Sequence, residues 1–288
     1  MSQILIAGCG FAGLATARVF HAAGWSVVGL THSPESAGAL RGEPFPVAPC
    51  DIANPGAVRG LAAQFGSAPD AILHCASSSR GGADSYRSVY LEGARNLLDA
   101  LAPKRFLFTS STSVYAQIDG GWVTEESPAD PTRETGRLLR ATEELVQSRG
   151  GIVARLAGIY GPGRSVLLRK FFTGEAVIED GGSRFVNQVH RDDIASALHV
   201  LITRGTSGIC NVCDDAPTPQ REIYEWLASR YDKPVPPFGP IEPNRKRGWT
   251  SKRVSNAKLR TLGWTPSFPS FFDAVERDPQ LEARARLA

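Results

Sequence analysis

A glycine-rich turn near the start of the chain has the spacing that binds a dinucleotide pyrophosphate. Gly8, Gly10 and Gly13 follow an apolar run, and Phe11 and Ala12 lie between the last two glycines. A helical pattern then runs over residues 14–23. Glycines permit a tight turn and a close backbone approach, and the start of a helix offers free N–H groups to phosphate. The order of strand, turn and helix therefore predicts a dinucleotide site; a glycine turn without a ligand is the alternative.

The end of the second predicted strand bears on which dinucleotide is bound. NAD-specific sites commonly carry an Asp or Glu about 20 residues past the glycine turn, where it binds the ribose 2′-hydroxyl. Thr31, His32 and Ser33 stand there instead, and all three side chains can donate hydrogen bonds to a 2′-phosphate. We therefore predict NADP(H) as the cofactor, with NAD(H) as the alternative.

The cysteines and histidines form no pattern that predicts a metal site. Cys210 and Cys213 make a C-x-x-C pair, but residues 209–212 have the pattern of a strand. Positions three apart in a strand face opposite sides, so these two sulfurs should diverge. Five cysteines scattered through the chain suggest reduced thiols and a cytoplasmic protein, since disulfides usually come in even numbers in secreted chains.

The elements that must position these residues alternate regularly. Short apolar runs at 26–30, 45–48, 71–74, 105–109, 151–155 and 209–212 predict strands, and helical patterns occur at 58–65, 88–101, 138–149, 193–202 and 221–231. Such alternation predicts a Rossmann-like, doubly wound parallel sheet with helices on both faces. We expect residues 1–157, with about 186–215, to form the dinucleotide-binding domain. Residues 158–288, which are rich in proline, should form most of a small C-terminal substrate lobe.

Composition excludes several other classes of protein. The chain has 288 residues, 42% of them hydrophobic, and a net charge of only +3, which argues against nucleic acid or a membrane surface as a partner. No apolar stretch approaches the length that spans a bilayer, and no signal peptide is evident. We expect a small-molecule substrate, with a homodimer as one possible assembly.

Further motifs give the chain a resemblance to a known family. They are Cys50-Asp51-Ile52, His74-Cys75-Ala76, TSSTSVY at 109–115, RLAGIYGPG at 155–163, VHRDD at 189–193 and LGW at 262–264. With the glycine turn, these motifs resemble the extended short-chain dehydrogenase/reductase family of nucleotide-sugar epimerases and dehydratases. The resemblance implies that Asp51 and Ile52 contact adenine, that Cys75 and Ala76 line the cofactor, and that Ser111 carries the catalytic hydroxyl.

The chain departs from this family at the proton relay. The family's Y-x-x-x-K pair falls on Thr135 and Leu139, counted back from Glu143. The segment Thr135-Gly136-Arg137 is similar to an atypical branch that lacks the pair. Threonine does not ionise near neutral pH and leucine carries no charge, so proton transfer needs another group. Ser111, Tyr115 and Thr135 are the candidates; Tyr115 as a packing aromatic is the alternative.

Two sets of charged residues, one of arginines and one of aspartates, remain to be assigned. If the substrate carries phosphate, Arg164, Arg245 and Arg247 are its expected partners, because guanidinium pairs with phosphate through two hydrogen bonds. A solvated loop is the alternative for the last two. Asp193 is expected to cap the helix that follows it, a structural role, although a carboxylate pair with Asp192 for acid–base work is the alternative.

These observations lead to two functional hypotheses. The first is an NAD(P)-binding oxidoreductase or epimerase/dehydratase-like enzyme with a degenerate Tyr/Lys site, acting on a small polar, nucleotide-linked substrate. The second is a non-catalytic NADP-binding sensor or regulator. The glycine turn and Ser111 favour the enzyme, whereas the missing relay favours the sensor. A non-redox lyase or isomerase has no residue signal of its own.

Overall fold

A seven-stranded parallel sheet forms the centre of the protein. The computed structural model describes residues 1–65, 67–78, 81–241 and 249–283. In sheet order the strands are β12 (Gly208–Val212), β7 (Ile152–Leu156), β5 (Arg105–Ser111), β4 (Ala71–His74), β1 (Gln3–Ala7), β2 (Ser26–Thr31) and β3 (Val47–Pro49). The strand order reverses between β1 and β4. In doubly wound sheets the ligand crevice lies at that point, outside the carboxyl ends of the strands.

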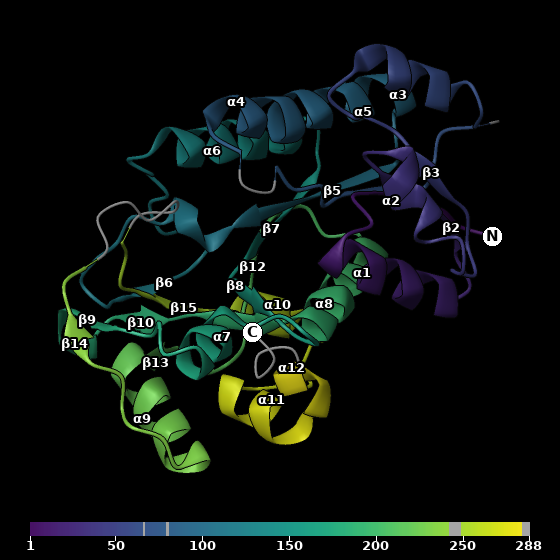
Figure 1. Ribbon diagram of the computed structural model, residues 1–288. Coiled ribbons are helices and arrows are strands. Elements are labelled where there is room, and N and C mark those ends of the chain that lie inside the picture. The colour runs from purple at the N-terminus through teal and green to yellow at the C-terminus, as the bar shows by residue number, and fades with distance from the viewer. Residues whose placement is uncertain (66, 79–80, 242–248, 284–288) are drawn as a thin grey trace.

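Helices cover both faces of this sheet (Figure 1). On one face lie α3 (Pro55–Ala62), α5 (Gly93–Leu101) and α6 (Glu134–Ser148), with the short α4 (Ala83–Tyr86) and the π-helical turn η1 (Arg87–Glu92) beside them. On the other face α1 (Phe11–Ala22) packs against α8 (Arg191–Arg204). The short α2 (Pro34–Gly38) follows β2. The doubly wound α/β fold predicted from the alternation of patterns is thereby confirmed.

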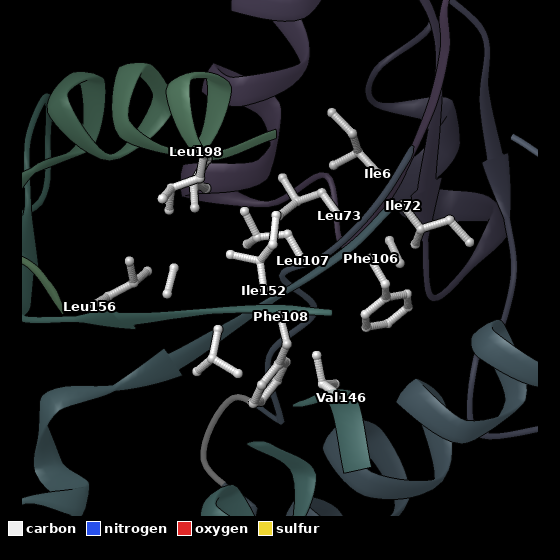
Figure 2. Close-up of a cluster of buried hydrophobic side chains, with 14 of the residues drawn as sticks. Ile6, Ile72, Leu73, Phe106, Leu107, Phe108, Val146, Ile152, Leu156 and Leu198 are labelled. Carbon is white, nitrogen blue, oxygen red and sulfur yellow. The ribbon is translucent and has the colours of Figure 1, made fainter. Parts of the chain in front are cut away.

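The two faces of the sheet bury alternate residues of each strand. In Figure 2 Leu107 of β5 points toward Leu198 of α8, whereas Phe106 and Phe108 point toward Val146 of α6. All five side chains are buried. Successive strand residues point to opposite faces, so a strand with helices on both sides must be apolar throughout. This is why the strands appear in the sequence as continuous apolar runs.

A smaller lobe with its own core follows β7. It contains β8 (Gly158–Tyr160), α7 (Val166–Phe172), β9 (Ile178–Glu179), β10 (Phe185–Val186), β11 (Gln188–His190), β13 (Thr218–Pro219), α9 (Gln220–Tyr231), β14 (Phe238–Gly239), α11 (Phe271–Arg277) and α12 (Pro279–Ala283). Its core includes Tyr160, Phe171, Tyr224 and Phe271. Between β14 and α11, β15 (Arg253–Val254) and α10 (Ala257–Thr261) pack into the core of the sheet through Val254 and Leu259. The strand β15 pairs in parallel with β6 (Trp122–Val123), so this segment is joined to the loop that follows β5.

Several expected elements differ in their bounds. The third strand is Val47–Pro49 rather than 45–48. Phe45 lies before the strand, and its apolar side chain is buried in the core without being part of the sheet. The helix expected over 88–101 opens with the π-helical turn η1. The helix expected at 193–202 begins at Arg191 and has His190 as its N-cap, so the expected capping role of Asp193 is wrong. Among the described residues no helix combines the length and hydrophobicity that crossing a bilayer requires.

Candidate functional site

Two glycines of the first turn are required by packing. Gly8 has a φ of +103°, and a Cβ there would lie 2.4 Å from the backbone of Ala76. A Cβ on Gly13 would lie 2.1 Å from the carbonyl oxygen of Gly8 and 2.7 Å from the sulfur of Cys75. The turn after β1 thus fits directly against the segment after β4, and only glycine allows both contacts.

Gly10 has a different reason to be glycine. It is exposed, its φ is −89°, and a Cβ there would meet no atom within 4 Å. No side chain of the described residues caps α1, and its first turn holds no acidic residue. The amides of Phe11 and Ala12 therefore begin a helix with a free positive end, the arrangement that binds phosphate. Open space at Gly10 is what a closely approaching pyrophosphate requires, so these residues fit a dinucleotide.

Two arginines stand over this turn. The guanidinium carbon of Arg164 lies 5.1 Å from the ring centre of Phe11, and that of Arg191 lies 5.4 Å from it. The predicted substrate residue Arg164 therefore lies beside the cofactor turn. Arg191 was not identified from the sequence, because nothing in its motif distinguishes it from a residue that anchors a helix. Arg245 and Arg247 lie outside the described residues.

The residues expected at the ribose 2′ position lie at the end of β2. Thr31 is buried and donates to the carbonyl oxygen of Ser33 at 3.3 Å, and Ser33 caps α2 by accepting from the amide of Ser36 at 3.3 Å. The side chain of His32 is 80% exposed, with Nδ1 3.7 Å from Oδ1 of Asp51. The Asp51 carboxylate, from the segment after β3, thus lies beside the end of β2.

The other residues carried over from the resemblance shape the turn. Cys75 donates its thiol to the carbonyl oxygen of Gly8 at 3.2 Å, and burial raises its pKa well above the usual value. Ile52 is buried against Gly93, where a Cβ would lie 2.9 Å from its side chain. Cys75 therefore holds the turn in place, and Ile52 packs against the start of α5.

A cavity of about 290 Å³ opens between the end of β5 and the start of α6. Thr135 and Leu139, the positions of the absent phenol and ammonium, both line it. The remaining lining residues are Tyr86, Ser113, Ala116, Ile118, Pro131, Thr132, Arg133, Gly136, Trp249 and Thr250. The cavity is thus built by the sheet domain and the C-terminal segment together, and its wall contains several hydroxyl groups.

Of the three expected catalytic residues, Thr135 is on the cavity wall and Tyr115 is in the core. Tyr115 has no exposed surface, and its hydroxyl donates to Oδ1 of Asn211 at 2.9 Å. Burial raises its pKa above the usual value. This geometry corrects the expectation of a proton donor and favours the packing role. Ser111 ends β5, is 7% exposed and accepts from the amide of Ser113, which itself lines the cavity.

A buried charge network holds α6 against the sheet. Glu143 has no exposed surface and accepts from Ser110 Oγ at 2.5 Å and from Arg155 at 3.0 and 2.7 Å. Arg140 donates to the same carboxylate. The Arg155 guanidinium also lies 4.7 Å from the ring centre of Tyr115. A buried charge is tolerated when it is paired and hydrogen-bonded, as the Glu143 carboxylate is. This network therefore sets the position of α6 at the cavity.

The described residues contain no cluster of three His, Cys, Asp or Glu side chains suited to a metal ion. Cys210 and Cys213 are buried, and burial raises the pKa of both thiols. Asp193 is also buried and accepts from the amides of Ser267 at 2.6 Å and Phe268 at 3.0 Å. Its carboxylate therefore ties α8 to the lobe, which is the structural role rather than acid–base work.

Comparison with known proteins places these features in a family. The model of the NAD dependent epimerase/dehydratase family matches residues 4–213. A structure from Methylobacillus flagellatus, described as a candidate NAD-dependent epimerase/dehydratase, is 28% identical with a TM-score of 0.79 and 99% of both chains covered. A conserved protein of unknown function from Silicibacter pomeroyi is 25% identical, with a TM-score of 0.71, covering 99% of this chain and 98% of that one.

The UDP-glucose 4-epimerase of Thermus thermophilus, solved in complex with NAD, has a TM-score of 0.81 at 19% identity, with 99% of both chains covered. At that identity the likeness shows the fold alone. A comparison with curated proteins found no match.

Proposed function

Because the chain belongs to the NAD-dependent epimerase/dehydratase family, we propose that it binds a nicotinamide dinucleotide at the β1–α1 turn and acts on a small polar, nucleotide-linked substrate. The observation that carries this proposal is the open space at exposed Gly10 beside the uncapped start of α1. Arg164 and Arg191 add positive charge over the same turn. A bound nicotinamide would supply hydride transfer; the chain's own residues would bind the pyrophosphate and orient the substrate.

The missing phenol and ammonium predict slow turnover on simple sugar nucleotides. General acid–base assistance is commonly worth about 10² to 10⁴ in rate, and neither Thr135 nor Leu139 supplies it. We expect tight dinucleotide binding, with slow turnover of UDP-glucose. The double variant Thr135→Tyr with Leu139→Lys should raise that rate, because both positions face the cavity. Turnover by the parent at ordinary epimerase rates would contradict this proposal.

We also propose a preference for NADP(H). The proposal rests on exposed His32, which can donate a hydrogen bond to a 2′-phosphate; the Asp51 carboxylate, 3.7 Å from His32, opposes it. Calorimetric titration of the parent with NADP and NAD measures the preference directly, and tighter binding of NAD contradicts it. Asp51→Asn should strengthen NADP binding and leave NAD binding nearly unchanged, because only the 2′-phosphate carries the repelled charge.

The second candidate function is a non-catalytic dinucleotide sensor. The absence of an ionisable group at Thr135 and at Leu139 favours it. This function predicts that the parent binds dinucleotide but does not consume it with any substrate. It also predicts that the double variant Thr135→Tyr with Leu139→Lys gains no activity. Cofactor consumption by the parent would exclude it.

A further inference from the structure

Lys252 occupies a site directly behind the cavity wall. The residue is 4% exposed, and its Nζ donates to the backbone oxygen of Tyr115 at 2.9 Å and to Oγ1 of Thr250 at 2.8 Å. Thr250 lines the cavity, and so does Ala116, the residue after Tyr115. The amine is therefore one hydrogen bond away from a hydroxyl on the cavity wall.

The surroundings of this amine disfavour a permanent charge. Among the residues that the structure describes, both hydrogen-bond partners of Nζ are neutral oxygens, and Arg184, which has the same sign, is the charged group that acts on it. A buried ammonium without an opposite charge loses much of its hydration energy. Burial, with a further contribution from Arg184, lowers the pKa of Lys252 to about 8. An amine of this kind can give and take a proton near neutral pH.

On this geometry, and resting on the proposed function, we propose that Lys252 serves the cavity as proton donor and acceptor through the hydroxyl of Thr250. A threonine hydroxyl is a weaker acid than a phenol, so this pair would replace only in part the phenol and ammonium that the family places at Thr135 and Leu139, and turnover would stay slow. Thr250 would be the catalytic residue, because its hydroxyl reaches the cavity. Lys252 would be the positioning and proton-supplying residue behind it.

Protons and electrons balance in the proposed step. For carbonyl reduction, the substrate carbon receives hydride from the reduced nicotinamide, and the electron pair of the C=O π bond moves to oxygen. That oxygen takes the proton of the Thr250 hydroxyl as the hydroxyl takes one from the ammonium of Lys252. The products are an alcohol, oxidised nicotinamide, an unchanged threonine and a neutral amine, which recovers a proton from water. Alcohol oxidation is the reverse, with the neutral amine as base.

The test is the pH dependence of NADPH consumption with phenanthrenequinone, a reactive diketone that needs no specific substrate pocket. The parent rate should fall tenfold per pH unit above about 8, as the ammonium that supplies the proton is lost. Lys252→Met and Lys252→Arg should both lower the rate by about 10² or more and remove this break, because a guanidinium does not readily release a proton. Thr250→Val should do the same, and Thr250→Ser should restore the rate.

Lys258→Met is the matched control, since Lys258 also donates from Nζ to a backbone oxygen, that of Ile209, at 2.7 Å but does not line the cavity. It should retain the parental rate and pH profile. Thermal unfolding and dinucleotide titration of each variant separate a loss of the relay from a loss of folding or of cofactor. Thr250→Val replaces a hydroxyl with a methyl group of similar size. It therefore tests the relay even if Lys252→Met does not fold.

The outcomes distinguish this inference from the proposed function. If the parent binds dinucleotide but consumes no NADPH, the enzymatic function fails and the relay fails with it. If the parent consumes NADPH and Lys252→Met keeps the same break near pH 8, the relay is overturned while the function stands. If Tyr86→Phe, on the cavity wall, removes the break instead, the phenol of Tyr86 is the donor and Lys252 is structural.

Discussion

Alanine substitutions at the three glycines of the first turn should separate folding from ligand binding. At Gly8 the positive φ costs an alanine about 1–2 kcal/mol, and the clash of its Cβ with the backbone of Ala76 adds about 1–3 kcal/mol. At Gly13 the added Cβ meets the carbonyl oxygen of Gly8 at 2.1 Å, which also costs about 1–3 kcal/mol. In both cases the obstacle is backbone, so a side-chain rotation cannot relieve it.

Gly10→Ala should behave in the opposite way. Its Cβ meets nothing within 4 Å and its φ is negative, so we expect a change of at most about 0.5 kcal/mol in the free energy of unfolding. The methyl group would instead project into the space assigned to the pyrophosphate. We expect dinucleotide affinity to fall by about 10- to 100-fold, which corresponds to roughly 1.4–2.7 kcal/mol.

Urea unfolding followed by circular dichroism measures the first quantity, and calorimetric titration with NADP and NAD measures the second. Gly8→Ala and Gly13→Ala should lose stability even without ligand, whereas Gly10→Ala should lose only affinity. Parental dinucleotide affinity in Gly10→Ala would show that the open space is not the pyrophosphate site. Parental stability in Gly8→Ala would refute the argument from close backbone approach.

Three further substitutions test the roles of buried polar groups. Glu143→Gln should destabilise the fold by about 3–5 kcal/mol in urea unfolding, because it leaves the buried guanidinium of Arg155 without its charge partner; stability equal to the parent would contradict the network. Tyr115→Phe should cost about 1–3 kcal/mol by leaving Asn211 Oδ1 without its donor, with NADPH consumption unchanged; lost activity at full stability would reinstate the phenol as an acid. Asp193→Asn should cost about 1–3 kcal/mol, since an amide oxygen replaces only part of a carboxylate that accepts two backbone amides, and a neutral result in thermal unfolding would reject its anchoring role.

The sheet, the glycine turn and the missing relay could all be predicted from the sequence. The four residues of β4 were predicted with the observed bounds, and β2, β5 and β7 nearly so. These features are local, because a strand buried on both faces is apolar at every position. The glycine turn is identified by its place between an apolar run and a helical pattern, whereas the contact that requires glycine at Gly8 comes from Ala76, far along the chain. The absence of an ionisable group at Thr135 and Leu139 is a property of residue type alone.

Which side chains meet at the cavity depends on the tertiary structure. Lys252 lies 137 residues from Tyr115, and no spacing along the chain signals that its amine would be buried behind Thr250. Tyr115 is a candidate for a chemical role by residue type, yet it is buried and its hydroxyl donates to Asn211, 96 residues away on β12. In the same way, Asp51, which follows β3, lies beside His32, which follows β2. Burial and partners depend on contacts between distant segments, and these set hydration and pKa, so residue type alone could not assign the roles.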